Sequence, residues 1–204
     1  YLSGWSYALP ITLDSTTREA FYPLPEGISA SINYFSELIG NDGEPLKNNY
    51  VSTAQELEAL SGKSGKYILT SDITIPDNFT SITNFTGDLY GNSYTINNDK
   101  AISVFESVNG AYISGLTLKG NTSSAFIDTA SATSLKDCVN YTNGAFVASL
   151  SSVSSFNRCA SYKSAFVSTL NAACILTNCF CVSCDFISTN TNSFDVEKTN
   201  CWHS

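Results

Sequence analysis

The sequence predicts an all-β fold, a parallel β-solenoid (β-helix) with coils of about 20 residues, and two observations carry this prediction. First, an Ala-Phe or Asp-Phe pair recurs every 20 residues in the second half of the chain. Second, the apolar runs between these pairs are short, rich in β-branched and aromatic residues, and show no helical period. A unit this short cannot bury its own apolar face, so copies must stack. A β-sandwich of short strands is the alternative.

Residues 1–50 are predicted to form a small irregular β-region ahead of the coils. This stretch holds four of the five prolines of the chain. It contains aromatic-rich strand candidates at residues 5–9 and 28–35, and the turn sequence Asn41-Asp42-Gly43 closes it.

Residues 51–65 are predicted to contain a capping helix. Thr53 is a candidate N-cap and Glu56 stands three residues later, the spacing of a capping box, with Leu57 and Leu60 following before Gly62. We expect this helix to cover the first coil, since an uncovered strand edge invites pairing. Residues 66–204 are then assigned to the solenoid repeats.

A ladder of stacked phenylalanines is predicted to form the core of the coils. In a parallel solenoid, equivalent residues of successive coils lie about 4.8 Å apart, and each buried Phe contributes roughly 1.5–3 kcal/mol. The predicted core ladder is Phe105, Phe126, Phe146, Phe166 and Phe186.

The residue after each repeated phenylalanine is β-branched. These residues should therefore stack into a second apolar column next to the phenylalanine ladder. Adjacent strand residues point to opposite faces, so an inward Phe ladder places an apolar stripe outside. A continuous exposed stripe of this kind marks a contact surface. The alternatives are a bend that buries both columns, or residues 1–50 folded over the stripe. The interface candidates are Ile127, Val147, Val167 and Ile187.

The seven cysteines all fall in the last third of the chain, and all are disulfide candidates if the protein is exported. Their odd number leaves at least one thiol for another chain or for no partner. Three of them share a column that Leu118 fills one coil earlier, so burial as small apolar residues is the alternative. A zinc site of Cys174, Cys179, Cys181 and Cys184 with His203 lacks the paired two-residue gaps of structural zinc sites. The disulfide candidates are Cys138, Cys159, Cys174, Cys179, Cys181, Cys184 and Cys201.

Four Asn-x-Ser/Thr sequons also favour export. The glycosylation candidates are Asn78, Asn84, Asn121 and Asn140. Asn121 and Asn140 each precede an Ala-Phe pair, in what should be the same polar corner of successive coils. We expect a corner of a solenoid to be exposed and able to carry a glycan.

Composition restricts the partners that this chain can have. Charged residues make up 14% of it and the net charge is −8, without a basic cluster, which disfavours nucleic acid and anionic membranes as partners. No run of 18 apolar residues is present, so no membrane span is expected. The absence of methionine and the start at Tyr1 fit a mature chain whose leader was removed, or a trimmed one.

One segment resembles a known family. Residues 52–118 are similar to the opening of GLUG-type β-solenoid repeats, and the most specific part is the phrase Phe85-x-Gly87-x-Leu89-x-Gly91-Asn92-x-Tyr94-x-Ile96. Those repeats occur in bacterial and archaeal surface proteins, including the non-catalytic part of immunoglobulin A proteases. Downstream, this chain has Ala-Phe phrases where the family has Gly-Leu-Phe, and the cysteines are its own. As a type of protein, the chain also resembles the subunits that form the outer sheaths of filamentous methanogenic archaea, although no single motif carries this likeness.

No catalytic, cofactor or metal site is predicted. Polysaccharide-cleaving solenoids need carboxylates that converge on neighbouring coils. At the 20-residue period Asp128 faces Ala148, and Asp137 faces Arg158, so no two acids share a column on adjacent coils. We therefore expect a non-enzymatic protein.

The sequence thus predicts a secreted structural protein that assembles with itself into an extracellular sheath, surface layer or filament. Strand-edge stacking and lateral packing would hold the polymer together, with intermolecular disulfides as an additional link. The alternative is an adhesin, or a receptor-binding solenoid of a phage or surface protein, that presents a face to surface glycans.

Overall fold

The computed structural model describes residues 5–7, 11–13, 16–18, 23–25, 49–190 and 192–204. The chain divides into two compact units, Tyr1–Tyr50 and Val51–Ser204. In the first unit, β1 (Trp5–Tyr7) pairs antiparallel with β4 (Pro23–Pro25), and β2 (Ile11–Leu13) pairs antiparallel with β3 (Thr16–Arg18). The strand candidate at residues 28–35 and the turn at residues 41–43 lie outside the described residues.

The strand β5 (Tyr50–Val51) includes the last residue of the first unit and the first residue of the second, and the helix α2 (Ala54–Glu58) follows it. Thr53 is the N-cap: its hydroxyl oxygen accepts from the Glu56 backbone N–H at 3.2 Å, while the Glu56 carboxylate accepts from the Thr53 N–H at 3.1 Å. This is the predicted capping box. Leu57 and Leu60 are buried in the core. The helix therefore packs its apolar side against the first coils.

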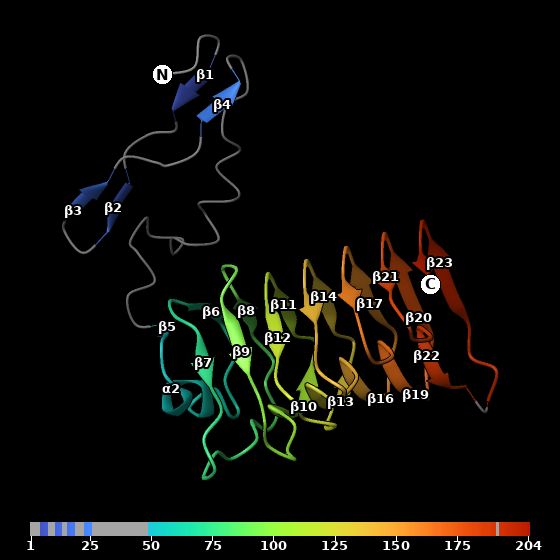
Figure 1. Cartoon of the computed structure of the whole chain (residues 1–204). Coiled ribbons are helices and arrows are strands. Elements are labelled where there is room, and N and C mark those ends of the chain that lie inside the picture. Colours follow the sequence, from blue (N-terminus) through green and yellow to red (C-terminus); the bar gives the residue numbers. More distant parts are fainter. Residues whose placement is uncertain (1–4, 8–10, 14–15, 19–22, 26–48, 191) are drawn as a thin grey trace. The chain divides into compact units, whose positions relative to one another are not determined.

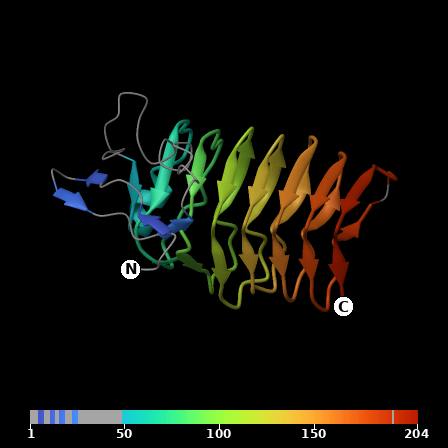
Figure 2. The same ribbon diagram turned by 90° about the horizontal axis from the view of Figure 1, so that it is seen from above.

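The remainder of the second unit is a parallel β-solenoid, as the sequence predicts. Figures 1 and 2 show its coils following one another in chain order along the stack. Each complete coil contributes one strand to each of three sheets, which we call sheets I, II and III. Sheet I contains eight strands: β5, β6 (Lys66–Leu69), β8 (Asp88–Tyr90), β11 (Tyr112–Ser114), β14 (Ser134–Lys136), β17 (Ser154–Asn157), β20 (Cys174–Thr177) and β23 (Val196–Thr199).

The other two sheets are built in the same way. Sheet II contains seven strands: β7 (Ile73–Thr74), β9 (Thr95–Asn97), β12 (Thr117–Lys119), β15 (Val139–Asn140), β18 (Ala160–Ser161), β21 (Phe180–Cys181) and β24 (Trp202–His203). Sheet III contains five strands: β10 (Phe105–Asn109), β13 (Ile127–Ser131), β16 (Val147–Leu150), β19 (Val167–Leu170) and β22 (Ile187–Thr189).

The corner between sheets I and II is held by a recurring backbone conformation. Asp137, Arg158, Asn178 and Asn200 all have φ between 51° and 54°, and Gly115 has φ 65° at the same corner one coil before Asp137. This left-handed conformation lets the chain turn tightly, and asparagine and aspartate tolerate it better than most residues. The sequence repeat is therefore also a repeat of local geometry.

Buried phenylalanines contact one another along the inside of the stack. The ring centroids of Phe146 and Phe166 are 5.2 Å apart, and those of Phe166 and Phe186 are 5.3 Å apart. The Phe105 ring lies 5.3 Å from that of Phe126, yet in strand register Phe105 pairs with Ile127. Phe105 thus belongs to the column of Ile127 and not to the column of Phe126. The predicted ladder takes a step of 21 residues from Phe105, whereas the paired positions of these two coils are 22 residues apart.

The predicted outward stripe is wrong, and the stated alternative, a bend that buries both columns, is confirmed. Ile127, Val147 and Val167 are fully buried, and Ile187 is partly buried. Strict alternation does not apply, because the phenylalanine before each of them lies in a bend and the strand begins only afterwards. Both columns consequently point into the core, one from the corner and one from sheet III.

Candidate functional surface

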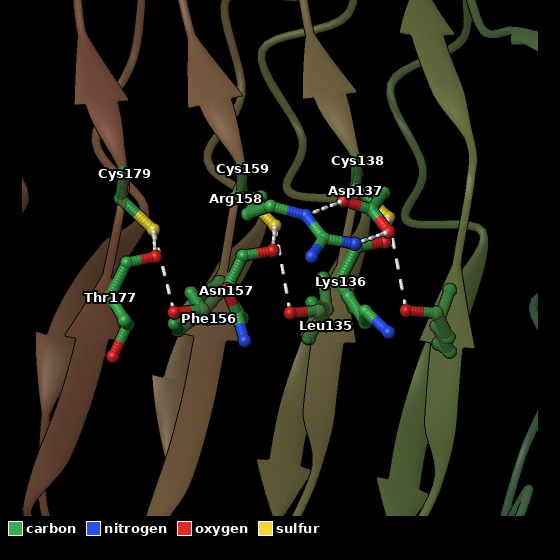
Figure 3. Close-up of polar contacts among 11 residues, drawn as sticks. Leu135, Lys136, Asp137, Cys138, Phe156, Asn157, Arg158, Cys159, Thr177 and Cys179 are labelled. Atoms are coloured by element: carbon green, nitrogen blue, oxygen red, sulfur yellow. Dashed lines mark hydrogen bonds and ion pairs between the residues drawn. The ribbon is translucent and has the colours of Figure 1, made fainter. Parts of the chain in front are cut away.

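Four cysteines form a column at the corner between sheets I and II, which we call the cysteine ladder. Figure 3 shows Cys138, Cys159 and Cys179 on successive coils, and strand register places Cys201 on the next coil. Each thiol lies near a carbonyl of its own coil and one of the preceding coil. The first three are buried and Cys201 is partly exposed.

The residue that precedes the cysteine ladder is Leu116, not Leu118 as the sequence predicts. Thr117 pairs with Val139, which aligns Leu116 with Cys138, whereas Leu118 pairs with Asn140. The difference arises because the paired positions of these two coils are 22 residues apart. The cysteines nevertheless continue an apolar column, as the burial alternative predicts.

Burial keeps several of the free thiols of the chain protonated. It raises the pKa of Cys174, which lies in β20, to about 12, and it raises the pKa of Cys159 well above the usual range. It is also the main cause of the raised pKa of Cys201. A protonated thiol is a weak nucleophile and a weak metal ligand, which favours a packing role for the buried Cys159 and Cys174. A hydrogen bond with the Cys159 thiol instead lowers the pKa of Cys138, and it lowers the pKa of Cys179 to about 7.

One disulfide is present, between Cys181 and Cys184, and the other five cysteines are free. The disulfide removes two ligands from the zinc hypothesis. Within the residues that the structure describes, no group of three or more His, Cys, Asp or Glu side chains is arranged to hold a metal ion. Of the free thiols, Cys201 alone is accessible enough to link two molecules.

The four sequons have different environments. Asn78, Asn84 and Asn121 are exposed. Asn140 is fully buried, and its amide nitrogen donates to the Gly144 carbonyl at 2.7 Å. The prediction that Asn140 lies in an exposed corner is therefore wrong, because its side chain turns inward from sheet II and bonds the backbone of the following turn.

The acidic residues of the coils do not converge. Asp137 and Arg158 form a two-pronged ion pair across adjacent coils, with Nε to Oδ1 at 2.5 Å and Nη2 to Oδ2 at 2.6 Å. Figure 3 shows this pair beside the cysteine ladder, and both side chains are exposed. Asp137 and Arg158, which are 21 residues apart, thus face each other on adjacent coils as the sequence repeat predicts. Asp128, Asp185 and Asp195 are exposed.

A column of outward residues on sheet II was missed in the sequence. It consists of Val139, Ala160, Phe180 and Trp202, each paired with the next across parallel strands, and we call it the outer column. Phe180 is 38% exposed and Trp202 is 62% exposed. The signal was available: each of these residues directly follows a cysteine of the ladder, and strand alternation turns it outward.

A shallow groove lies on the same side of the stack, near the start of the outer column. Its lining includes Thr117, Lys119, Asn121, Tyr141 and Lys163. Tyr141 stacks on Tyr162 of the next coil, with ring centroids 4.6 Å apart and planes 14° apart. The groove thus combines an aromatic ring with two ammonium groups and several polar side chains.

Comparisons of the chain with protein-family models, with curated proteins and with solved structures return no match. The resemblance to GLUG-type repeats therefore stays a prediction. No helix in the described part of the chain is long and apolar enough to cross a bilayer.

Proposed function

We propose that this chain is a structural module of an extracellular or cell-surface protein, and that it packs laterally against copies of itself to form a sheath, layer or filament. The single observation that supports this most is the outer column of sheet II. Phe180 and Trp202 are large, exposed and adjacent across the β21–β24 pair. An exposed aromatic patch on a sheet face is typical of a protein contact surface.

The composition of the surrounding strands also favours close packing. The strands β15, β18, β21 and β24 contain no Asp, Glu, Lys or Arg. Two such faces can approach without bringing like charges together. The Cys181–Cys184 disulfide supports an oxidising compartment outside the cell.

Lateral packing is favoured over simple head-to-tail stacking. The Gly62 N–H donates to the Thr83 carbonyl at 2.8 Å, and the Thr80 N–H donates to the Glu58 carboxylate at 2.6 Å. The residues around α2 thus lie beside residues 80–83, which precede β10 at the edge of sheet III. A strand from a neighbouring molecule would have to pair at this same edge to extend sheet III. A neighbouring stack would need to displace the helix before it could continue all three sheets at this end.

The test is sedimentation velocity of the full chain over a range of concentrations. We expect large species for the wild-type chain and monomers for the double variant Phe180→Ser/Trp202→Ser. Val153→Ser is the matched control, since Val153 is 52% exposed but lies outside the outer column. Any shrinkage on adding reductant should disappear in Cys201→Ser, because the other free thiols are buried. A wild-type chain that stays monomeric at high concentration would refute the proposal.

A second candidate function is glycan binding by a surface or receptor-binding module. The groove at Tyr141 favours it, because an exposed tyrosine beside polar side chains is a common arrangement in small-molecule sites. This candidate does not require self-association, so a strictly monomeric chain would leave it standing.

A further inference from the structure

The groove at Tyr141 presents a partly exposed aromatic ring that is held in place by a stacked neighbour. Tyr141 follows Asn140 in β15, and its neighbours in register are Lys119 on the preceding coil and Tyr162 on the following one. Tyr162 stacks against one face of the Tyr141 ring, with only 14° between the planes. On the other side of the ring, Lys119 occupies the equivalent position one coil earlier, and it also lines the groove. Tyr141 is 39% exposed.

The charge of the groove is opposite to that of the chain. Both charged residues that line it, Lys119 and Lys163, are cationic, although the net charge of the chain is −8. The ion pairs found among the described residues are Lys100 with Asp77 and Arg158 with Asp137. The two groove lysines are therefore without an ion-pair partner within that part of the chain. They can attract an anionic ligand.

Two carboxylates lie near the groove, and both are occupied by backbone donors. Asp72 accepts from the Thr95 N–H at 2.7 Å, and Asp99 accepts from the Asn121 N–H at 2.8 Å. Neither residue lines the groove. These hydrogen bonds hold the carboxylates against the backbone of the coil that follows each one.

From this geometry we propose that the groove binds a saccharide chain that carries carboxylate groups. The exposed part of the Tyr141 ring would pack against the apolar C–H face of one sugar ring. Lys119 and Lys163 would attract the carboxylates, and the side chains of Thr95, Thr117 and Asn121 can exchange hydrogen bonds with sugar hydroxyls. This inference rests on the second candidate function above and names its ligand class.

The test uses the full chain produced without N-glycosylation, because Asn121 is itself a sequon residue in the groove. The probes are hexasaccharides of galacturonate, hyaluronan and alginate, titrated by calorimetry and by 1H-15N NMR. The matched probe is the galacturonate hexamer with every carboxylate methyl-esterified, which keeps the sugar chain and removes its charge. We expect at least one acidic probe to bind, with an affinity that falls as salt is raised.

Variants then assign the binding to the groove. Tyr141→Ala and the double variant Lys119→Gln/Lys163→Gln should each weaken binding of the acidic probe by about tenfold or more, equal to about 1.4 kcal/mol. The controls are Tyr112→Ala and Lys136→Gln, which change the same residue types on sheet I and should leave the affinity unchanged.

The outcomes separate this inference from the function on which it rests. Equal binding of the methyl-esterified hexamer and the free acid would overturn the acidic ligand class while supporting glycan binding. Failure of all acidic and neutral probes would overturn both. Acidic binding that survives the Tyr141 and lysine variants would place the ligand elsewhere and overturn the groove assignment.

Discussion

At the scale of single residues, Asn140 shows how a polar side chain can occupy an apolar column. In register it follows Ile96 and Leu118, which are buried, and it precedes Ser161. Its amide oxygen accepts from the Thr142 backbone N–H at 2.9 Å, and its nitrogen donates to the Gly144 carbonyl. Full hydrogen bonding makes the burial of a polar group tolerable. A glycan on Asn140 would need this same enclosed space.

Cys174 allows a pH-dependent prediction at the same scale. Burial raises the pKa of its thiol to about 12, whereas an unfolded cysteine titrates at about pH 8.5. Above the unfolded pKa the unfolded chain has lost the proton and the folded chain retains it. The free energy of unfolding should therefore fall as pH rises from about 9 towards 12, by about 1.4 kcal/mol per pH unit from this residue.

The matched variant for this prediction is Cys174→Ser. Ser154 pairs with Cys174 in register and is buried one coil earlier, so the column accepts serine. Urea denaturation at several pH values would compare the two chains. The alkaline loss of stability should be smaller in the variant by the stated slope. Parallel pH profiles for both chains would contradict the prediction.

At the scale of elements, the backbones of successive coils come very close to each other at two glycines, Gly120 and Gly144. A Cβ atom added to Gly144 would overlap the Ser124 carbonyl oxygen, and one added to Gly120 would overlap the Asn98 carbonyl oxygen. Both contacts join one coil to the coil before it. Glycine is required here because the neighbouring atoms belong to backbone and cannot turn aside.

Gly144→Ala should accordingly destabilise the solenoid. We expect a loss of about 1–3 kcal/mol, the usual range for overpacking, because the two coils must separate to admit the methyl group. The control is Gly110→Asn: Gly110 has φ 66° but open space where a Cβ atom would lie, and asparagine tolerates this conformation. Urea denaturation of the two variants should rank Gly144→Ala as clearly less stable. Equal stability would contradict the predicted contact.

At the scale of the whole molecule, the solenoid unit contains its own core. Its buried residues run from Val51 to Phe186 and include α2 and all three sheets. In a stack of this kind, each coil is stabilised mainly by its two neighbours. The described residues of the first unit form two separate strand pairs.

We therefore expect Val51–Ser204 to fold when produced alone. The apolar contacts that hold the coils together are internal to this unit, so removing residues 1–50 should leave the far-ultraviolet circular dichroism of the β-structure and the urea midpoint nearly unchanged. Amide hydrogen exchange would check that the sheet hydrogen bonds remain protected. A fragment that is unfolded, or that loses protection throughout the sheets, would show that the first unit is part of the cooperative structure.

The sequence by itself determined the solenoid, the capping box at Thr53 and Glu56, the buried phenylalanines of the repeat, and the facing of Asp137 and Arg158. These features repeat at a fixed spacing or depend on local contacts, so a periodicity in the chain is enough to place them. The period does not reveal coils that depart from it, such as the 22-residue step that pairs Phe105 with Ile127.

Only the tertiary structure decided which side of each coil faces water. Ile127 is buried although strict strand alternation predicts it outside, Asn140 is buried although it is polar, and Trp202 is exposed although it is apolar. The groove likewise joins Lys119, Tyr141 and Lys163 from three successive coils. The physical reason is that the direction of a side chain depends on where the bend between two strands falls. A shift of that bend by one residue turns the side chain from the core to the surface.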